Sequence, residues 1–145
     1  MKHLLFAAGV LLASIQLAQA CPVAGVGALQ LSYDAVQMDM EYSVDVVAGG
    51  DVDLSDCGYV SGWVITEPDV SFTLSGINGP LQVSIDSPGC DTVLLINAPD
   101  GSWHYDDDSW GELMPTLQAF MDDGRLDVWV GTYDGSVCDA QIVLN

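Results

Sequence analysis

Basic side chains are almost absent from this chain. Lysine and arginine together number 2 against 21 aspartate and glutamate residues, which gives a formal net charge of −19. Proteins bind nucleic acid through cations that neutralise phosphates, so this composition argues strongly against a nucleic-acid partner. It argues equally against electrostatic attachment to anionic membranes. Charge of one sign destabilises the compact state by self-repulsion, so salt, bound cations or covalent cross-links are expected to compensate.

Residues for common catalytic and metal chemistry are also scarce. The sequence contains 2 histidines, His3 and His104, and no two of its 4 cysteines are spaced as CxxC. Zinc binding and dithiol redox chemistry are therefore not expected. The segment 58–62, GYVSG, does not fit the G-x-S-x-G nucleophile elbow and lies in an expected strand. We therefore expect a protein that is not an enzyme.

The chain has one long apolar run, at its beginning. Lys2 and His3 precede the apolar stretch from Leu4 to Ile15, and the segment 18–20, AQA, has a small-x-small pattern. This arrangement is typical of a secretory signal peptide, and the run is too short to span a bilayer. The sequence thus predicts a signal peptide over residues 1–20, and an exported domain over residues 21–145 that is not a membrane protein. Cleavage would make Cys21 the first residue, which leaves lipidation of its thiol as an alternative.

Four cysteines remain after that cleavage: Cys21, Cys57, Cys90 and Cys138. An even number of cysteines in an exported chain indicates disulfide bonds. Three pairings are compatible with the sequence. A bridge that closes a loop of tens of residues stabilises a fold by about 3 to 5 kcal/mol in the chain-entropy model.

The hydrophobic pattern is that of β-strands almost throughout. Apolar and polar residues alternate over residues 36–46, with the period of two expected for a strand that has one wet face. Only Leu113 to Met121 could form a helical turn or two, and Pro115 limits it. Short strands at this spacing predict a single all-β domain, an antiparallel β-sandwich of jelly-roll type. Further strands are predicted at Tyr59 to Ile65, Val70 to Ser75, Leu81 to Ile85, Thr92 to Asn97, Trp103 to Tyr105, Leu126 to Tyr133 and Ala140 to Leu144.

The turn 98–101, APDG, predicts a β-hairpin. A turn of these four residues would pair Leu95 with His104 and Asp91 with Asp108. His104 would then lie on the face opposite the core. The core face would carry Leu94, Ile96, Trp103 and Tyr105.

Acidic residues gather at one end of this predicted hairpin. Opposed like charges on a sheet are destabilising, and a calcium ion, which takes six to eight oxygen ligands, would relieve them. The segment beginning at Asp106 resembles the start of an EF-hand loop, but Leu117 stands where that loop needs a glutamate. The alternative is a solvated turn without a metal. The calcium ligands would be Asp106, Asp107 and Asp108, with Asp91 or Asp56 as a further ligand.

The segments 91–115 and 124–135 together carry a recognisable pattern. They combine a D-x-x-L strand, a P-x-G turn, an acidic D-D loop and the return strand GRLDVWVG. This pattern resembles the secreted bacterial β-sandwich domains of the pre-peptidase C-terminal type. The segment 42–74 resembles a proteobacterial branch of small exported proteins with the same pattern, so the resemblance covers roughly residues 42–144. Such domains are non-catalytic, usually accompany secreted peptidases, and in some cases bind calcium or extracellular polymers.

The resemblance also implies a disulfide pairing. In that branch the position of Tyr105 is often a cysteine, and here its absence requires a different partner for Cys57. The related proteins place that partner near Cys90, so the resemblance implies the bridges Cys57–Cys90 and Cys21–Cys138. The first bridge would draw Asp56 towards the acidic end of the hairpin.

Two functions are compatible with these observations. The first is a stand-alone binding or accessory module for a periplasmic or extracellular polymer or protein, with Trp63, Trp110 and Tyr133 facing the ligand. The second is a structural or protective exported protein, adapted to saline surroundings, that has no discrete ligand.

Overall fold

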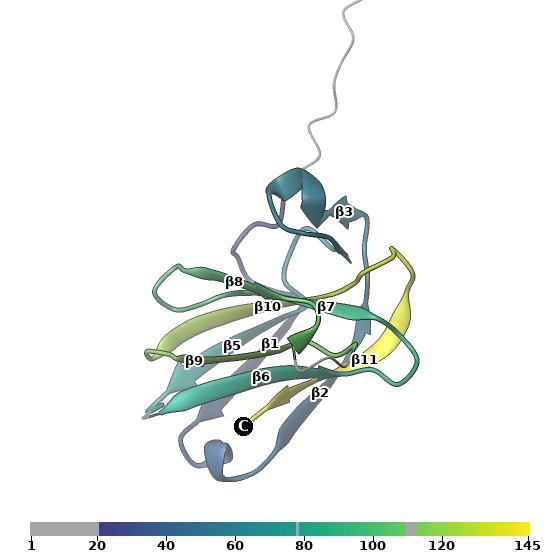
Figure 1. Ribbon diagram of the computed structural model, residues 1–145. Helices are drawn as coiled ribbons and strands as arrows, with labels where there is room; N and C mark the ends of the chain where they lie inside the picture. The colour runs from purple at the N-terminus through teal and green to yellow at the C-terminus, as the bar shows by residue number, and fades with distance from the viewer. Residues whose placement is uncertain (1–20, 78, 110–112) are drawn as a thin grey trace, which may run out of the picture.

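The computed structural model describes residues 21–77, 79–109 and 113–145. Within these residues the chain forms two facing β-sheets and two short 3-10 helices, without an α-helix (Figure 1). The predicted all-β sandwich is therefore confirmed. The larger sheet contains β1 (Leu29–Asp34), β3 (Val52–Asp53), β4 (Trp63–Val64), β5 (Val70–Ser75), β7 (Thr92–Asn97), β8 (Trp103–Asp106) and β10 (Gly124–Thr132). The smaller sheet contains β2 (Tyr42–Ala48), β6 (Pro80–Asp86), β9 (Thr116–Phe120) and β11 (Cys138–Leu144), and the 3-10 helices are η1 (Gln37–Asp39) and η2 (Leu54–Cys57).

Strand β10 is the centre of the larger sheet. It pairs with β7 along one edge and with β5 and then β4 along the other. Strands β8, β1 and β3 extend the sheet beyond β7, β5 and β4. The smaller sheet has the order β2-β11-β6-β9. The strand pairs given for the described residues are antiparallel except for β1 with β5, so the antiparallel prediction holds with one parallel pair at an edge.

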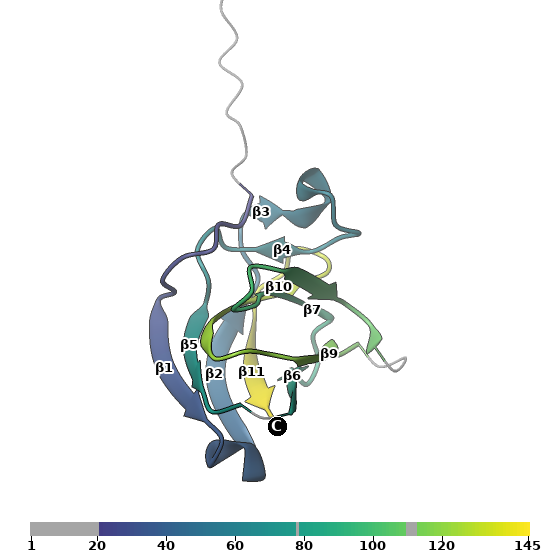
Figure 2. The same ribbon diagram turned by 90° about the vertical axis from the view of Figure 1, so that its left-hand side faces the viewer.

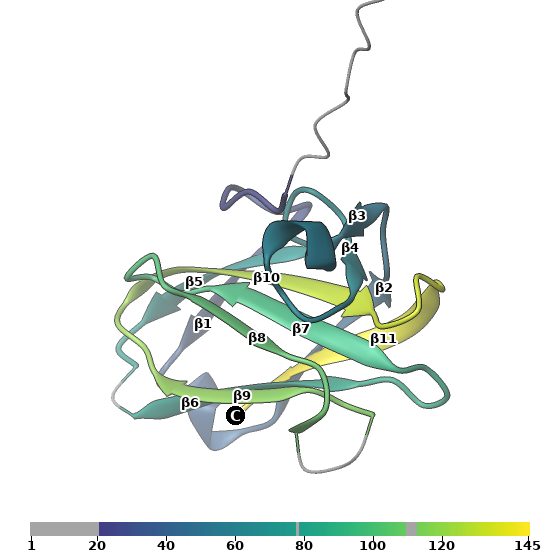
Figure 3. The same cartoon turned by 45° about the horizontal axis from the view of Figure 1, so that its top comes forward.

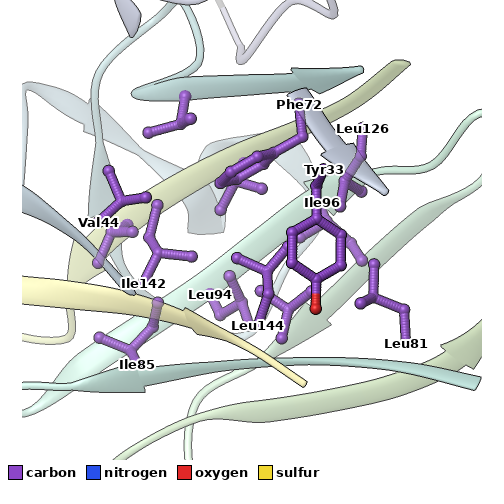
Figure 4. Packing of buried hydrophobic residues seen from close by; sticks show 14 of the residues in the cluster. Tyr33, Val44, Phe72, Leu81, Ile85, Leu94, Ile96, Leu126, Ile142 and Leu144 are labelled. Atoms are coloured by element: carbon purple, nitrogen blue, oxygen red, sulfur yellow. The ribbon is translucent and has the colours of Figure 1, made fainter. Parts of the chain in front are cut away.

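The main core fills the space between the two sheets. Figure 4 shows Phe72 and Leu94 from the larger sheet packed among Ile142 and Leu144 from the smaller one. Burial of one such side chain stabilises the fold by about 1.5 to 3 kcal/mol. The alternation in the sequence directs these residues inward, and in β6 every second residue is buried.

A second core lies on the outer face of the larger sheet. Residues 50–65, which include β3, η2 and β4, fold over that face and are called the cap below (Figure 2). Val93, Leu95 and Trp129 of the sheet pack with Leu54 and Val64 of the cap. Strand β7 is therefore buried on both faces, which explains why its sequence is a continuous apolar run rather than an alternating one.

The cap packs tightly against Gly131 of β10. A Cβ atom added to this glycine would lie 2.5 Å from the carbonyl oxygen of Trp63. Real Cβ atoms do not come so close to backbone atoms, so a side chain at this position would push the cap from the sheet.

The predicted strand over residues 36–46 is wrong in its first half. Strand β2 begins only at Tyr42, and η1 precedes it. The carboxylate of Asp34 accepts the backbone N–H groups of Val36 and Gln37 at 3.0 and 3.2 Å. Such local bonds give the backbone an alternative to strand pairing, so the alternation upstream of residue 42 lies in a turn.

Two other segments also differ from the predictions. The strand predicted at residues 59–65 is reduced to β4, because Gly58 ends η2 in a left-handed conformation and the next residues form a turn. The segment 113–121 forms the strand β9 rather than a helical turn. Pro115 restricts a helix, and pairing with β6 over five residue pairs gives this segment its backbone partners.

The β7–β8 hairpin differs from its predicted register by one residue. Leu95 lies opposite Tyr105, and Ile96 lies opposite His104. The backbone groups of residues 98 and 102 are bonded across a three-residue loop whose last residue, Gly101, has φ +83°. A three-residue loop of this kind has a residue in the left-handed conformation that forms a bulge and has no partner in the opposite strand. This unpaired residue shifts the register by one from the predicted one.

The shifted register exchanges the faces of β8. The predicted core residues Trp103 and Tyr105 lie on the cap side of the sheet, where Tyr105 packs against the second core. His104 lies on the inner side with Ile96, at the edge of the sandwich.

The predicted disulfide pairing is wrong. The bridges are Cys21–Cys57 and Cys90–Cys138, with Cα–Cα distances of 5.7 and 6.6 Å. Strand β11 pairs with β6, and this pairing brings Cys138 to the turn that follows β6 and contains Cys90. Cys57 ends η2 in the cap, and the segment beginning at Cys21 runs beside the cap, where Val23 N–H donates to Thr66 O at 3.1 Å.

Candidate functional site

Three of the predicted calcium ligands lie around one small hollow. Asp91, Asp107 and Asp108 line a cavity of about 170 Å³ together with Leu113 and Tyr133. Partial burial raises the pKa of the Asp91 carboxyl, and the negative charges of Asp108 and Asp107 raise it further. Like charges are thus gathered here, as the sequence predicted.

The other two predicted ligands are held elsewhere. The carboxylate of Asp106 accepts the backbone N–H of Thr116 at 2.7 Å and so joins β8 to β9. Asp56 is an exposed residue of η2, and the bridge between Cys57 and Cys21 gives it no tie to Asp91. In the described part of the chain, no group of three or more Asp, Glu, His or Cys residues is arranged to hold a metal ion. The full set of five carboxylates is therefore not assembled, and calcium binding stays a prediction.

The predicted ligand-facing aromatics have different surroundings. Tyr133 is 42 % exposed beside the acidic hollow. Trp63 is half-buried, and its indole packs beside Gly135. Trp110 lies outside the described residues. Sequence reasoning missed Trp103, which is 38 % exposed and lies 5.1 Å from the ring of Trp129.

Tyr105, which was predicted in the core, links the β7–β8 hairpin to the cap. Its hydroxyl donates to the carbonyl oxygen of Ser61 at 2.7 Å, and its ring lies 5.4 Å from that of Tyr59. Burial and the nearby carboxylate of Asp107 raise the pKa of the Tyr105 hydroxyl. This phenol therefore stays protonated and serves as a hydrogen-bond donor.

His104 is next to a serine, but the hydrogen bonds between them are not those of a serine with its general base. The Nε2 atom of His104 lies 2.9 Å from the Oγ of Ser102, and this hydroxyl also lies 2.6 Å from the Oδ1 of Asp100. A hydroxyl has one proton to donate, and an ionised carboxylate can only accept. The Ser102 proton therefore goes to Asp100, so the Nε2 of His104 must be the donor in its bond to Ser102. In this arrangement the histidine cannot remove the serine proton.

A wide hollow lies on the outer face of the smaller sheet. It has a volume of about 840 Å³ and extends over β2, β11 and the turn after β6. The hydrophilic residues around it are Asp45, Asp86, Asp139 and Gln141. The amide of Gln141 donates to Asp45 Oδ1 at 2.6 Å and so fixes both side chains. We call this hollow the sheet groove.

Sequence reasoning did not single out the sheet groove. Its polar residues occupy the outward positions of β2 and β11, where they read as ordinary solvated positions of alternating strands. The pairing of β2 with β11 places Val47 opposite Asp139 and Asp45 opposite Gln141. The signal is visible only once the register is known.

Comparisons with known proteins give no further guidance. No family model matches the sequence, and no curated protein matches it. No helical segment in the described part of the chain has the length and hydropathy of a membrane span. The two disulfides indicate an oxidising compartment, as expected for an exported protein.

Proposed function

We propose that this chain is a non-catalytic exported binding module that holds a polymer or protein through the sheet groove. One observation carries the proposal. The cap packs on the outer face of the larger sheet at Val93, Leu95 and Trp129, whereas the outer face of the smaller sheet has a hollow of about 840 Å³. Binding sites are concave and fix their ligands through a few placed polar groups. The fixed pair of Asp45 and Gln141 supplies such groups.

The chemistry of the groove favours ligands rich in hydrogen-bond donors. Asp45, Asp86 and Asp139 present carboxylates, which accept hydrogen bonds and attract amino groups. Hydroxyls and protonated amines of an extracellular polymer fit this set. The resemblance to domains that accompany secreted peptidases supports the same role, and an accessory role to a peptidase is part of this proposal.

Cosedimentation with insoluble polysaccharide tests the proposal. The protein with intact disulfides should bind partly deacetylated chitin, which carries amino groups, more tightly than fully acetylated chitin. Asp139→Asn together with Gln141→Ala should weaken binding about fivefold, since a lost hydrogen bond of this kind costs about 1 kcal/mol. Asp56→Asn removes the same charge from the cap and should leave binding unchanged. Equal effects of the two substitutions would show that net charge, not the groove, attracts the polymer.

A calcium ion at the acidic hollow is the second part of the proposal. Asp91, Asp107 and Asp108 would be its carboxylate ligands, because they line the same cavity. These side chains are not arranged to hold a metal ion as they stand, so calcium would have to draw the three carboxylates together. Calcium at a hundred times its dissociation constant would stabilise the fold by about 2.7 kcal/mol. The melting temperature should rise with millimolar calcium at fixed ionic strength, and Asp107→Asn with Asp108→Asn should abolish that rise. Identical melting curves with calcium and with chelator would show that the acidic residues form a solvated turn without a metal.

A further inference from the structure

A third and smaller cavity lies in the seam between the two sheets. The edge strands β8 and β9 meet there, and Asp106 of β8 accepts the backbone N–H of Thr116 of β9. The turn between β7 and β8 and the turn between β9 and β10 lie at the same end of the sandwich (Figure 3). The residues around them enclose about 110 Å³. We call this space the seam cavity.

The lining of the seam cavity is amphipathic. Ala98, Pro99, Ala119 and Met121 supply apolar walls, and the carboxylates of Asp100 and Asp122 accompany them. The cavity is well below the roughly 300 Å³ at which pockets for small organic ligands begin. It therefore has room for a single side chain rather than for a sugar chain or a folded segment.

An exposed aromatic residue marks the same place. Phe120 lines the seam cavity and is 85 % exposed, more than any other large apolar residue in the described part of the chain. An exposed aromatic beside a cavity is a common feature of contact surfaces. The face of an aromatic ring also attracts cations.

The carboxylate of Asp100 is fixed in position. Its Oδ1 accepts the backbone N–H of Ser102 at 2.8 Å and the Ser102 hydroxyl at 2.6 Å. These hydrogen bonds lower the pKa of the Asp100 carboxyl, so the charge beside the cavity persists in mildly acidic surroundings. A charge held in place in this way costs a ligand little reorganisation.

His104 is the one basic side chain in the lining, and its Nε2 already bonds to Ser102. The described part of the chain offers no lysine or free arginine to this site. Its one arginine, Arg125, lies 3.0 Å from the carboxylate of Asp127, and it contains no lysine. Lysine and arginine side chains have an apolar stem and a cationic head. That combination matches apolar walls, a fixed carboxylate and an exposed aromatic ring. We propose that the seam cavity receives a lysine or arginine side chain of a protein partner.

Three short peptides test this site by amide-resolved NMR titration of the intact disulfide-bonded protein. The first is acetyl-Gly-Ser-Lys-Ser-Gly-amide. The second replaces lysine with norleucine, which keeps the apolar stem without the charge. The third replaces lysine with diaminopropionic acid, which keeps the charge on a short stem. The lysine peptide alone should give saturable shifts at Ser102, His104 and Phe120.

Two substitutions test which side chains of the seam cavity bind the lysine. Asp122→Asn should weaken lysine-peptide binding about two- to fivefold, the range of an exposed ion pair. Phe120→Ser should weaken it as well, and the exposure of this side chain leaves the fold intact. Asp139→Asn removes the same charge from the sheet groove and should have no effect at the seam. It therefore also separates a failure of this inference from a failure of the groove proposal.

The remaining outcomes would overturn the inference. Equal shifts with the norleucine peptide would show a purely apolar contact. Equal shifts with the diaminopropionic acid peptide would show attraction to net charge without a site. Amide shifts spread over the acidic residues of the whole surface would show the same. The absence of shifts at the seam would show that the cavity receives no basic side chain.

Discussion

The carboxyl group of Asp69 should make the protein less stable at neutral pH than at mildly acidic pH. Asp69 directly precedes β5 and lies beside the short part of β10 that separates its pairing with β5 from its pairing with β4. The Oδ2 of Asp69 accepts the backbone N–H of Val130 at 2.8 Å. The carbonyl oxygen of Val130 accepts the N–H of Gly49 at 3.0 Å. On its other edge Val130 pairs with Leu94 of β7. The Asp69 side chain thus bonds a backbone N–H that has no paired strand on its own edge, but it does so away from water.

Burial decides the sign of the effect. Loss of solvation raises the pKa of the Asp69 carboxyl from 3.8 to about 6, against the opposing effect of the Val130 hydrogen bond. A raised pKa in the folded state means that protonation favours folding. The contribution of Asp69 to stability is therefore fully present below pH 3.8 and is lost as the pH rises through about 6. A shift of this size corresponds to about 3 kcal/mol.

Asp69→Asn isolates this contribution. The amide oxygen can accept the Val130 N–H without carrying a charge, so the variant should be more stable than the parent at pH 7, by up to about 3 kcal/mol. At pH 3.5 the two proteins should have nearly equal free energies of unfolding. Urea denaturation at pH 3.5, 5 and 7, followed by tryptophan fluorescence without reductant, measures the difference.

An exposed carboxylate provides the control with the opposite sign. Hydrogen bonds from the Ser136 hydroxyl and backbone N–H lower the pKa of Asp134. Asp134→Asn should therefore lose stability at pH 7, and that loss should vanish as the pH falls below the range of an ordinary aspartate. An Asp69→Asn variant that is equally or less stable than the parent at pH 7, or whose advantage is independent of pH, would refute the reasoning.

Two further substitutions test how the sheet holds its partners. Gly131→Ala should destabilise the fold by about 1 to 3 kcal/mol, because the added methyl group would meet the carbonyl oxygen of Trp63 and lift the cap. A melting temperature equal to that of the parent would show that the cap moves freely. Arg125→Met should lower the stability by about 1 to 3 kcal/mol, because it leaves the buried carboxylate of Asp127 without its cation. Arg125→Lys should restore part of the loss. Unfolding curves that coincide for Arg125→Met and the parent would show that Ser71 and the backbone are sufficient partners for the Asp127 carboxylate.

The strands that were predicted correctly are those whose burial follows a simple rule. Strand β6 alternates, and β7 is a continuous apolar run between turn residues, so both could be read from sequence. Strand β1 also alternates, but its paired partner is the distant and parallel β5, and the pattern was not recognised. Strand β9 was misread because pairing with β6, not local preference, determines its conformation.

The hairpin and the disulfides were wrong for different reasons. The register of the hairpin depends on the role of Gly101, which can belong to a four-residue turn or form a bulge at the end of a three-residue loop. A change of one residue exchanges the two faces of a strand. The disulfides depend on which strands are neighbours in the smaller sheet, and the pairing of β11 with β6 cannot be derived from cysteine spacing. Residue identity predicted two bridges, and topology decided the partners.

The candidate sites follow the same division. The acidic hollow was predicted in part, because Asp91, Asp107 and Asp108 approach through the local hairpin. The sheet groove needs a contact between strands far apart in the sequence, and the seam cavity needs two consecutive strands that join different sheets. Their polar residues look like solvated positions until β2 lies beside β11 and β8 beside β9. No local pattern could have marked them.

The disulfides offer a way to separate the two proposed binding regions. Cys138 lines the sheet groove, and its bridge to Cys90 holds the turn that forms one wall of that groove. The seam cavity has no cysteine in its lining. A bridge with a sequence separation of 48 residues stabilises the fold by about 4 kcal/mol in the chain-entropy model.

Removal of this bridge should therefore affect the two regions unequally. Cys90→Ser with Cys138→Ser should lower the melting temperature and weaken polysaccharide binding, because the wall of the groove is no longer fixed to β11. Below the new melting temperature, the lysine peptide should bind the seam with unchanged affinity, since its apolar walls and Asp100 are held by β7, β9 and the adjoining turns. If both affinities fall together well below that temperature, the two ends of the sandwich are coupled. Equal polysaccharide binding with and without the bridge would instead place the polymer outside the sheet groove.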